Sequence, residues 1–269
     1  MVILREKPEW GFMNILKTLV LSTLAVSAVG SVSAADVDQL KINTTATTST
    51  TLASGADSVA IGQDAKTADT AKNSIAIGKG ATVSQNQWYA ANANDRKLGP
   101  EYASAGAIAI GNGASSQHQA AISLGQEAKA GAQASTAIGR TAQALGTLDT
   151  AVGADSTANG TGASAFGALA QATGYTSTAI GDNSRATNTY SSALGVSSRS
   201  TGTASIAVGA LSEATGEFSS ANGYVSLASG KYSIANGYGV VASGHSAIAI
   251  GAVTTGLRGG QRRAHLHML

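Results

Sequence analysis

A short motif returns at a fixed interval along most of this chain. The motif is Ala-[Ile/Val/Leu/Phe/Asn]-Gly, and its glycine recurs every 14 residues in all ten intervals between Gly111 and Gly251. Two earlier copies end at Gly62 and Gly78, and the interval from Gly78 to Gly111 is 33 residues. A fixed period of this kind is typical of proteins built from stacked repeats. The motif glycines, which we expect to lie at turns, are Gly62, Gly78, Gly111, Gly125, Gly139, Gly153, Gly167, Gly181, Gly195, Gly209, Gly223, Gly237 and Gly251.

Each 14-residue unit divides into two halves of seven. A second glycine follows seven residues after the motif glycine in many units, as at Gly146 and Gly160, and Asn188 takes that place once. Because Asn is the residue that best replaces Gly at positive φ, we expect this second column to be a left-handed turn position. Glycine at every seventh residue would also break a helix before two turns are complete. Each half is therefore predicted to be a short strand that ends at a tight turn.

Alternation within each strand assigns its side chains to two faces. The residue two before the motif glycine is Ala in twelve of thirteen copies and Ser123 in the other. In residues 135–139, Ala137 takes one face, whereas Thr136 and Ile138 take the other. Aromatic residues make up only 4% of the chain, so a thick core is excluded and small side chains are predicted to line a thin coil. The expected fold is an all-β parallel β-roll of about 13 coils, each adding ~4.8 Å along the axis.

The residue just before each motif glycine is aliphatic or Phe in eleven copies and Asn in two. Stacked one per coil, these side chains would form a ridge that a soluble monomer would not leave in water. We therefore expect a homo-oligomer with its ridges on a common axis, although the periodicity leaves open which face turns inward. The ridge consists of Ile61, Ile77, Ile110, Leu124, Ile138, Val152, Phe166, Ile180, Leu194, Val208, Asn222, Asn236 and Ile250.

Asn222 and Asn236 are the polar members of the ridge and are consecutive in it. In an oligomer they would form a polar ladder near the axis that costs stability and fixes register, as single polar core residues do in coiled coils. The alternative is that Asn-Gly marks a tighter turn here, with the side chain facing outward.

The repeats SVAIG (58–62), SIAIG (74–78), STAIG (135–139 and 177–181) and SIAVG (205–209) resemble the YadA-like head repeat of trimeric autotransporter adhesins. The resemblance covers about residues 54–256. It implies a left-handed β-roll, the hand coming from the family alone, and a homotrimer that forms the head of a Gram-negative surface adhesin. It also implies a non-catalytic virulence protein that binds host extracellular-matrix proteins, host cells or its own kind in autoagglutination. An intact family member is displayed at the cell surface from the outer membrane.

The two ends of the chain lie outside the repeats. Residues 1–34 are predicted to be a signal peptide for export, with Lys17 before the apolar run 19–29 and a small-residue end at 32–34, and Met13 is an alternative start. A Thr-rich segment, 35–53, leads into the repeats. The basic tail, 257–269, has neither the heptads nor the membrane strands that the resemblance would call for. We expect a truncated or frame-shifted adhesin without membrane contact of its own, or a secreted protein if the chain is complete.

The long interval before Gly111 holds 19 extra residues, within the segment 85–104. Insertions in solenoids form loops on one face, often the binding face, and Trp, Tyr and Arg are favoured anchors at interfaces. The alternative is a loop that folds back to brace the roll. The candidate ligand-binding residues are Trp88, Tyr89, Arg96, Lys97 and Tyr102.

Other function classes find little support. Residues 35–257 hold 11 Lys and Arg against 13 Asp and Glu, about −2 in all, so nucleic acid is not an expected partner. The chain has no Cys, and its four His residues share no column, so we expect no metal and no cofactor. No Ser/His/Asp arrangement can be assembled, so no catalytic residue is assigned and an enzyme is not expected. The alternative to an adhesin is a secreted β-solenoid that binds ice or serves another structural role, and the absence of threonines in register over consecutive coils counts against it.

Overall fold

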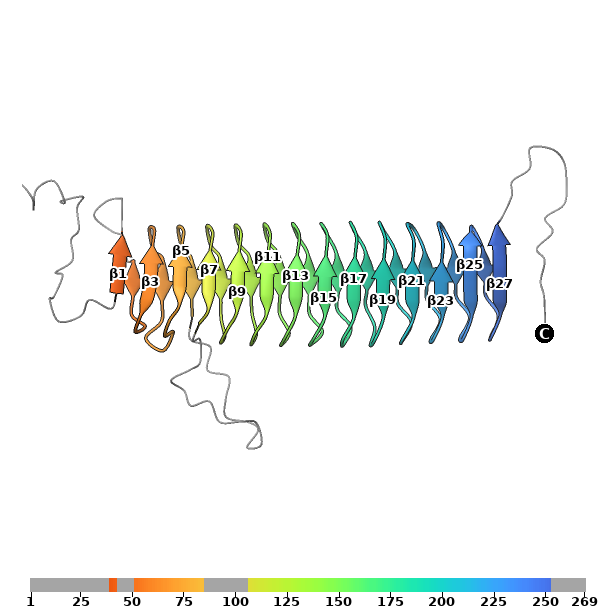
Figure 1. Ribbon diagram of the computed structural model, residues 1–269, viewed down its shortest axis with the longest axis horizontal. Helices are drawn as coiled ribbons and strands as arrows, with labels where there is room; N and C mark the ends of the chain where they lie inside the picture. The colour runs from red at the N-terminus through yellow and green to blue at the C-terminus, as the bar shows by residue number, and fades with distance from the viewer. Residues whose placement is uncertain (1–38, 43–50, 85–105, 253–269) are drawn as a thin grey trace, which may run out of the picture.

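The structure, a computed structural model, describes residues 39–42, 51–84 and 106–252. These residues form a straight rod in which two parallel sheets lie face to face along the whole length (Figure 1). Odd-numbered strands build one sheet and even-numbered strands the other, so each coil contributes one strand to each. The predicted parallel β-solenoid is thereby confirmed. Within the described ranges, no helix is long and apolar enough to cross a membrane.

Sheet A, as we call the 14-stranded sheet, contains every strand that carries the motif. Its strands are β1 (Gln39–Ile42), β3 (Ser58–Ile61), β5 (Ile75–Ile77), β7 (Ile108–Ile110), β9 (Ile122–Leu124), β11 (Thr136–Ile138), β13 (Thr150–Val152), β15 (Ser164–Phe166), β17 (Thr178–Ile180), β19 (Ser192–Leu194), β21 (Ile206–Val208), β23 (Ser220–Asn222), β25 (Ile234–Tyr238) and β27 (Ile248–Ala252).

Sheet B, the 13-stranded sheet, is built from two-residue strands. They are β2 (Leu52–Ala53), β4 (Lys66–Thr67), β6 (Thr82–Val83), β8 (Ser115–Ser116), β10 (Lys129–Ala130), β12 (Gln143–Ala144), β14 (Thr157–Ala158), β16 (Gln171–Ala172), β18 (Arg185–Ala186), β20 (Arg199–Ser200), β22 (Glu213–Ala214), β24 (Leu227–Ala228) and β26 (Val241–Ala242).

The coils stack in an unbroken register that follows the 14-residue period. Ala137 pairs with Ala151 in the next coil, and every later motif strand pairs with its successor in the same way. The long interval does not interrupt this register, because Ile77 pairs with Ile110 and Val83 with Ser116. The coils before and after the long interval are therefore direct neighbours in both sheets.

The space between the sheets is filled by small side chains. The alanine two before the motif glycine is fully buried in coil after coil, as at Ala137 and Ala179, and so are Ala142 and Ala144 from the second half of the coil. The largest fully buried side chain among the described residues is Val83. The small-residue interior predicted from the repeat is thus confirmed, and it explains why sheets A and B can approach so closely.

Serine hydroxyls hold the turns at both ends of the coil. Ser156 donates to the carbonyl oxygen of Gly153 at 2.9 Å, and Ser135 donates to that of Ala132 at 2.6 Å. Each serine thus bonds to the carbonyl three residues earlier, and short side chains that satisfy a turn carbonyl in this way are favoured at such positions. Ser184, Ser198, Ser212 and Ser226 repeat the first arrangement, and Ser191, Ser205, Ser219 and Ser233 repeat the second.

The second glycine column is not a left-handed turn position, so that prediction was wrong. Gly146 and Gly160 do not have positive φ, and the left-handed residue comes two places later, at Leu148 (φ 61°) and Gly162 (φ 71°). Glycine is needed for a steric reason instead, because a Cβ on Gly160 would lie 2.0 Å from the carbonyl oxygen of Gly174 in the next coil. The backbones of the two coils are in contact here, so a side chain at Gly160 would force the next coil to shift.

One buried acid departs from the serine pattern of the second turn. Asp149 is fully buried in the column that Ser135 occupies in the preceding coil and Ser177 two coils further on. Its carboxylate accepts hydrogen bonds from the backbone N–H groups of Gly146 (2.8 Å), Gly160 (3.0 Å) and Ala163 (2.8 Å). A buried charge is tolerated when donors satisfy it in this way. Asp149 therefore ties two consecutive coils together.

Candidate interaction surface

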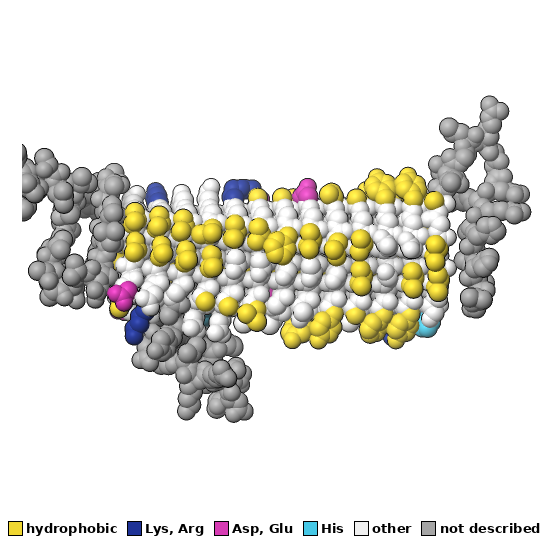
Figure 2. Space-filling view, viewed as in Figure 1, with side chains coloured by type: hydrophobic (Ala, Val, Ile, Leu, Met, Phe, Trp, Pro, Cys, Tyr) yellow, Lys and Arg dark blue, Asp and Glu magenta, His cyan; other side chains and the backbone are white. Residues whose placement is uncertain are grey.

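The two sheets present opposite chemistry to their surroundings. The ridge runs along the outer face of sheet A. Its side chains are half-buried at Ile61, Ile77, Leu124 and Val152 and exposed at the other positions, up to 68% at Ile250. Figure 2 shows this face, with hydrophobic side chains in rows parallel to the rod. An apolar stripe that runs the length of a molecule marks an interaction surface.

A second column widens the ridge at both ends of the rod. It lies two residues before the ridge residue in each motif strand, on the same face of sheet A. Near the N-terminal end it holds Val59, Ile75, Ile108 and Ile122, and near the C-terminal end Ile206, Ile234 and Ile248. In the five middle coils this column is Thr or Ser, so the apolar surface narrows there, as Figure 2 shows. The alternation predicted that the two columns share a face, but only a coil-by-coil comparison shows the apolar surface widening at the ends.

The outer face of sheet B is mostly polar, although Leu52, Leu227 and Val241 occupy its central column near the two ends. Its central column includes Gln143, Gln171, Arg185, Arg199 and Glu213, and Arg199 lies 3.5 Å from Glu213 in an exposed ion pair. Charged and amide side chains of this kind are stable in water, whereas the apolar ridge face is the one that would gain by burial.

Four threonines stand in register beside sheet B. Thr173, Thr187, Thr201 and Thr215 follow consecutive strands of sheet B at intervals of 14, and their backbone N–H groups donate to the next coil in the same way. The expectation that threonine is out of register across consecutive coils was therefore wrong. The column two residues earlier, however, is Gln171, Arg185, Arg199 and Glu213, so a flat array of paired threonine rows does not form.

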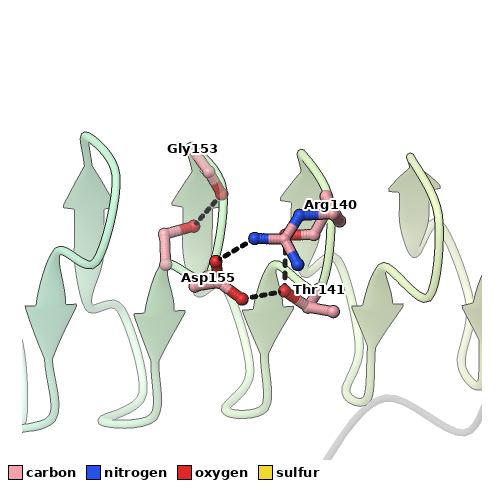
Figure 3. A network of polar contacts seen from close by, with 5 residues as sticks. Arg140, Thr141, Gly153 and Asp155 are labelled. Carbon is pink, nitrogen blue, oxygen red and sulfur yellow. Dashed lines mark hydrogen bonds and ion pairs between the residues drawn. The ribbon is translucent and has the colours of Figure 1, made fainter.

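The turns form the two edges of the roll. The first-turn edge comprises the two residues after each motif glycine. The second-turn edge comprises Gly146–Leu148 and their equivalents in the other coils, which lie between a sheet B strand and the next motif strand. On the first-turn edge, Arg140 donates from Nη2 to Asp155 Oδ2 at 2.6 Å, and the Thr141 hydroxyl donates to Asp155 Oδ1 (Figure 3). This network joins two neighbouring coils. Because Arg140 is largely exposed, the ion pair contributes little to stability.

Aromatic side chains collect on both edges near the C-terminal end. Tyr224 and Tyr238 are stacked on the first-turn edge, with ring centroids 5.6 Å apart. Phe218 and Tyr232 are stacked on the second-turn edge at 5.3 Å. All four are exposed, and Figure 2 shows hydrophobic side chains along both edges in this part of the rod. Tyr175 and Tyr190, further toward the N-terminal end of the second-turn edge, are also exposed.

The predicted ligand-binding residues lie outside the described residues. Trp88, Tyr89, Arg96, Lys97 and Tyr102 all fall within 85–105, so their role stays a prediction. The residues that flank this segment are described: Ser84 donates its N–H to Ser116 O and Gly106 donates to Lys72 O. Both therefore stand at the second-turn edge, where the chain passes from β6 to β7.

Neither a metal centre nor an acid–base pair was found among the described residues. No three His, Cys, Asp or Glu side chains of these ranges gather in a way that could hold a metal ion. His118 is isolated on the second-turn edge, and burial lowers the pKa of its imidazole below the ordinary value of 6.5. Lys231 has a raised pKa because its ammonium group bonds to the carboxylate of Glu217.

Asn222 and Asn236 hold the same backbone position as the aliphatic ridge residues. They pair with each other in register and are followed by Ile250. Gly223 and Gly237 have φ of 131° and 133°, within the range of 118° to 141° for all thirteen motif glycines. The turn after Asn222 is closed by the bond from Ser226 N–H to Gly223 O as in other coils, whereas β25 runs on to Tyr238, so neither Asn-Gly step makes a tighter turn and that alternative was wrong. Both side chains are exposed on the ridge face, with no hydrogen bond to any described residue.

The structure thus defines a class of protein, a parallel β-solenoid with a small-residue interior and one apolar outer face. The family model described as YadA head domain repeat matches residues 53–81, 70–87, 119–142, 144–170, 172–198, 200–226 and 228–254. These segments together make up more than half of the chain, which therefore belongs to the YadA head family. No curated protein matches the chain.

Proposed function

We propose that this chain is the head of a homotrimeric surface adhesin. In the trimer, three rolls stand side by side with the outer faces of sheet A packed on a common axis and sheet B facing outward. The trimer binds host extracellular-matrix proteins or host cells, or other trimers, through its outward surface, and it has no catalytic activity. Export by the predicted signal peptide brings it to the surface of a Gram-negative bacterium.

The observation that carries this proposal is the ridge. Eleven of its thirteen members are aliphatic or Phe, and they occupy one face of a rod whose opposite face is mostly polar. Burying such side chains gives roughly 25 cal/mol per Å² of apolar surface removed from water. A head-to-tail contact between identical copies also closes into a ring when the rotation permits, which suits three parallel rolls.

The first experiment measures the mass of the exported full chain in solution, by light scattering coupled to size exclusion. We expect a trimer. The variant Ile138→Lys/Ile180→Lys places charges in the middle of the ridge, so it should dissociate the trimer into monomers. Gln143→Lys, which adds a charge on the outer face of sheet B, is the matched control and should remain trimeric.

The second experiment measures adhesion. Trimeric protein should bind immobilised collagen, fibronectin or laminin, or cultured epithelial cells, with an avidity that the monomeric Ile138→Lys/Ile180→Lys variant loses. A chain that is monomeric and binds none of these surfaces would overturn the proposal.

An ice-binding solenoid is the second candidate, and the register of Thr173, Thr187, Thr201 and Thr215 favours it. The charged column beside these threonines speaks against it, because Arg185, Arg199 and Glu213 carry strongly hydrated groups. An ice-recrystallisation assay on the full chain decides between the two. Inhibition that Thr187→Lys abolishes would support the second candidate.

A further inference from the structure

Two consecutive strands of sheet A interrupt the ridge. β23 contributes Asn222 and β25 contributes Asn236, whereas the preceding Val208 and the following Ile250 are apolar. If the ridge lies on the axis of a trimer, apolar contact is lost there at these two levels of the rod.

The same two levels carry aromatic residues at both edges. The chain enters β23 from Phe218 and leaves it through Tyr224, and it enters β25 from Tyr232 and leaves it through Tyr238. In the part of the chain that the structure describes, no other strand of sheet A is flanked in this way by Phe or Tyr on both sides. The apolar surface therefore moves from the face to the edges where the ridge becomes polar.

Charge at these edges is already balanced within the chain. On the second-turn edge, Lys231 Nζ lies 2.8 Å from Glu217 Oε2 and 5.1 Å from the centroid of the Tyr232 ring. On the first-turn edge the neighbours of the two tyrosines are Val225 and Gly239, which are uncharged. Each edge thus offers a neutral aromatic surface suited to another such surface.

The geometry of a ring of parallel rolls brings the two edges together. A rotation about an axis parallel to the rod carries no translation, so equivalent levels of the three rolls stay at the same height. With sheet A facing the axis, the first-turn edge of one roll lies beside the second-turn edge of the next. Tyr224 then stands at the level of Phe218 in the neighbouring copy, and Tyr238 at the level of Tyr232.

We propose that Tyr224 and Tyr238 of each copy pack against Phe218 and Tyr232 of the next copy, forming three aromatic seams between the rolls. This inference rests on the proposed trimer and names the contact that holds its last coils. Offset and edge-to-face aromatic contacts stabilise such packing beyond the area they bury. The axial asparagines then have one another as hydrogen-bond partners, and the seams supply the apolar contact that the axis lacks.

Engineered thiols test the seam directly, because the chain contains no Cys. In the full chain, Phe218→Cys/Tyr224→Cys places one thiol on each edge, and a thiol-specific cross-linker with the reach of two aromatic side chains should convert it to covalent trimers. Phe218→Cys alone and Tyr224→Cys alone should give no covalent oligomer, because the first-turn edge of one copy lies beside the second-turn edge of the next, so two identical thiols never face each other. Thr173→Cys/Tyr224→Cys, with one thiol on the outer face of sheet B, is the matched control and should also stay uncross-linked.

Thermal dissociation of the trimer provides an independent measurement. Tyr224→Ser/Tyr238→Ser should lower the dissociation temperature clearly, whereas Tyr175→Ser, on an edge without an aromatic counterpart at its level, should lower it much less. A trimeric chain whose double-thiol variant yields no covalent trimer, or whose single-thiol variants cross-link to dimers, overturns the seam alone. An unmodified chain that is monomeric overturns the proposed trimer and the seam with it.

Discussion

Gly153 lies directly below the backbone of Gly167 in the next coil, so close that a Cβ on Gly153 would be 2.3 Å from the Gly167 carbonyl oxygen. Gly153 also has a φ of 137°, a conformation that side chains rarely adopt. Sterics and backbone conformation thus both require glycine here, and the same two conditions recur from Gly62 to Gly237.

Gly153→Ala is expected to cost about 3 kcal/mol or more in the free energy of unfolding, because strain and a backbone clash add. Gly162→Ala is the matched control: φ is 71° there, but the nearest atom to a new Cβ, Thr176 Oγ1, is 3.9 Å away. Its cost should be about 1–2 kcal/mol, from the left-handed conformation alone. Thermal unfolding followed by circular dichroism compares the two, and equal losses would contradict the steric argument.

Ser123 and Ser116 are predicted to be coupled in the interior. Ser123 is the one departure from Ala in its column, and its hydroxyl lies 2.9 Å from that of Ser116 and accepts the N–H of Ala130. Ser123→Ala should cost about 1–2 kcal/mol, since a buried polar partner is removed. Adding Ser116→Ala should recover part of this loss, with a coupling free energy of about 1 kcal/mol in a double-mutant cycle. Strictly additive effects would show that the two hydroxyls act independently.

Asp149→Ala should destabilise the roll more than any serine substitution in the same column. Three backbone N–H groups lose their acceptor, and each buried unsatisfied donor costs about 1–3 kcal/mol. Asp149→Asn, which keeps the shape and one carbonyl oxygen, should lose less. Ser135→Ala is the matched comparison, because the Ser135 hydroxyl bonds only within its own turn, donating to Ala132 O and accepting the Ala132 N–H. Unfolding by denaturant measures all three, and an Asp149→Ala loss no larger than that of Ser135→Ala would refute this role.

His118 makes stability depend on pH. Burial lowers the pKa of the folded-state imidazole below 6.5, so below about pH 6.5 the unfolded chain binds more protons than the folded one. The free energy of unfolding should therefore fall as pH decreases from about 7 to about 5, and it should level off below the folded-state pKa. His118→Gln should remove this part of the dependence. The melting temperatures of the two proteins are measured across this pH range. If both change with pH by the same amount, His118 is excluded as the cause.

Replacing Asn222 and Asn236 by Ile should raise the melting temperature of the trimer. Each Ile would extend the apolar ridge, and full burial of such a side chain contributes about 1.5–3 kcal/mol. The gain should come with a loss of register between the copies, because a uniform ridge permits one roll to slide past another by one coil. In coiled coils, polar core residues prevent such sliding. A double variant that melts at the same temperature or lower would place the two asparagines away from the axis.

Much of the architecture could be predicted from the 14-residue period. Ala137 and Ile138 were assigned to opposite faces by alternation alone, and their burial agrees, because a period of two leaves no other arrangement once the strands are recognised. The tight interior also followed from the absence of bulky residues at the Ala positions.

The backbone conformation of the second turn could not be predicted from the sequence, for a physical reason. Residues that favour β or helical conformations, such as Leu148, Tyr190 and Phe218, adopt the left-handed conformation there, held by the coils on either side. These residue types therefore do not indicate a left-handed position. The glycine found two residues earlier in many coils suggests one, but it is there because adjacent backbones are in contact. The aromatic edges were missed for a related reason, since each aromatic appears isolated until the coils are stacked.

The unbroken register allows the number of coils to change during evolution. Ala137 and Ala151 occupy equivalent places, so recombination between the gene segments that encode them would remove or add one whole coil and join strands already aligned. Because each coil contacts only its neighbours, the cross-section of the rod would stay the same. The rod can therefore lengthen or shorten in steps of one coil, while the pairing of its strands carries over unchanged.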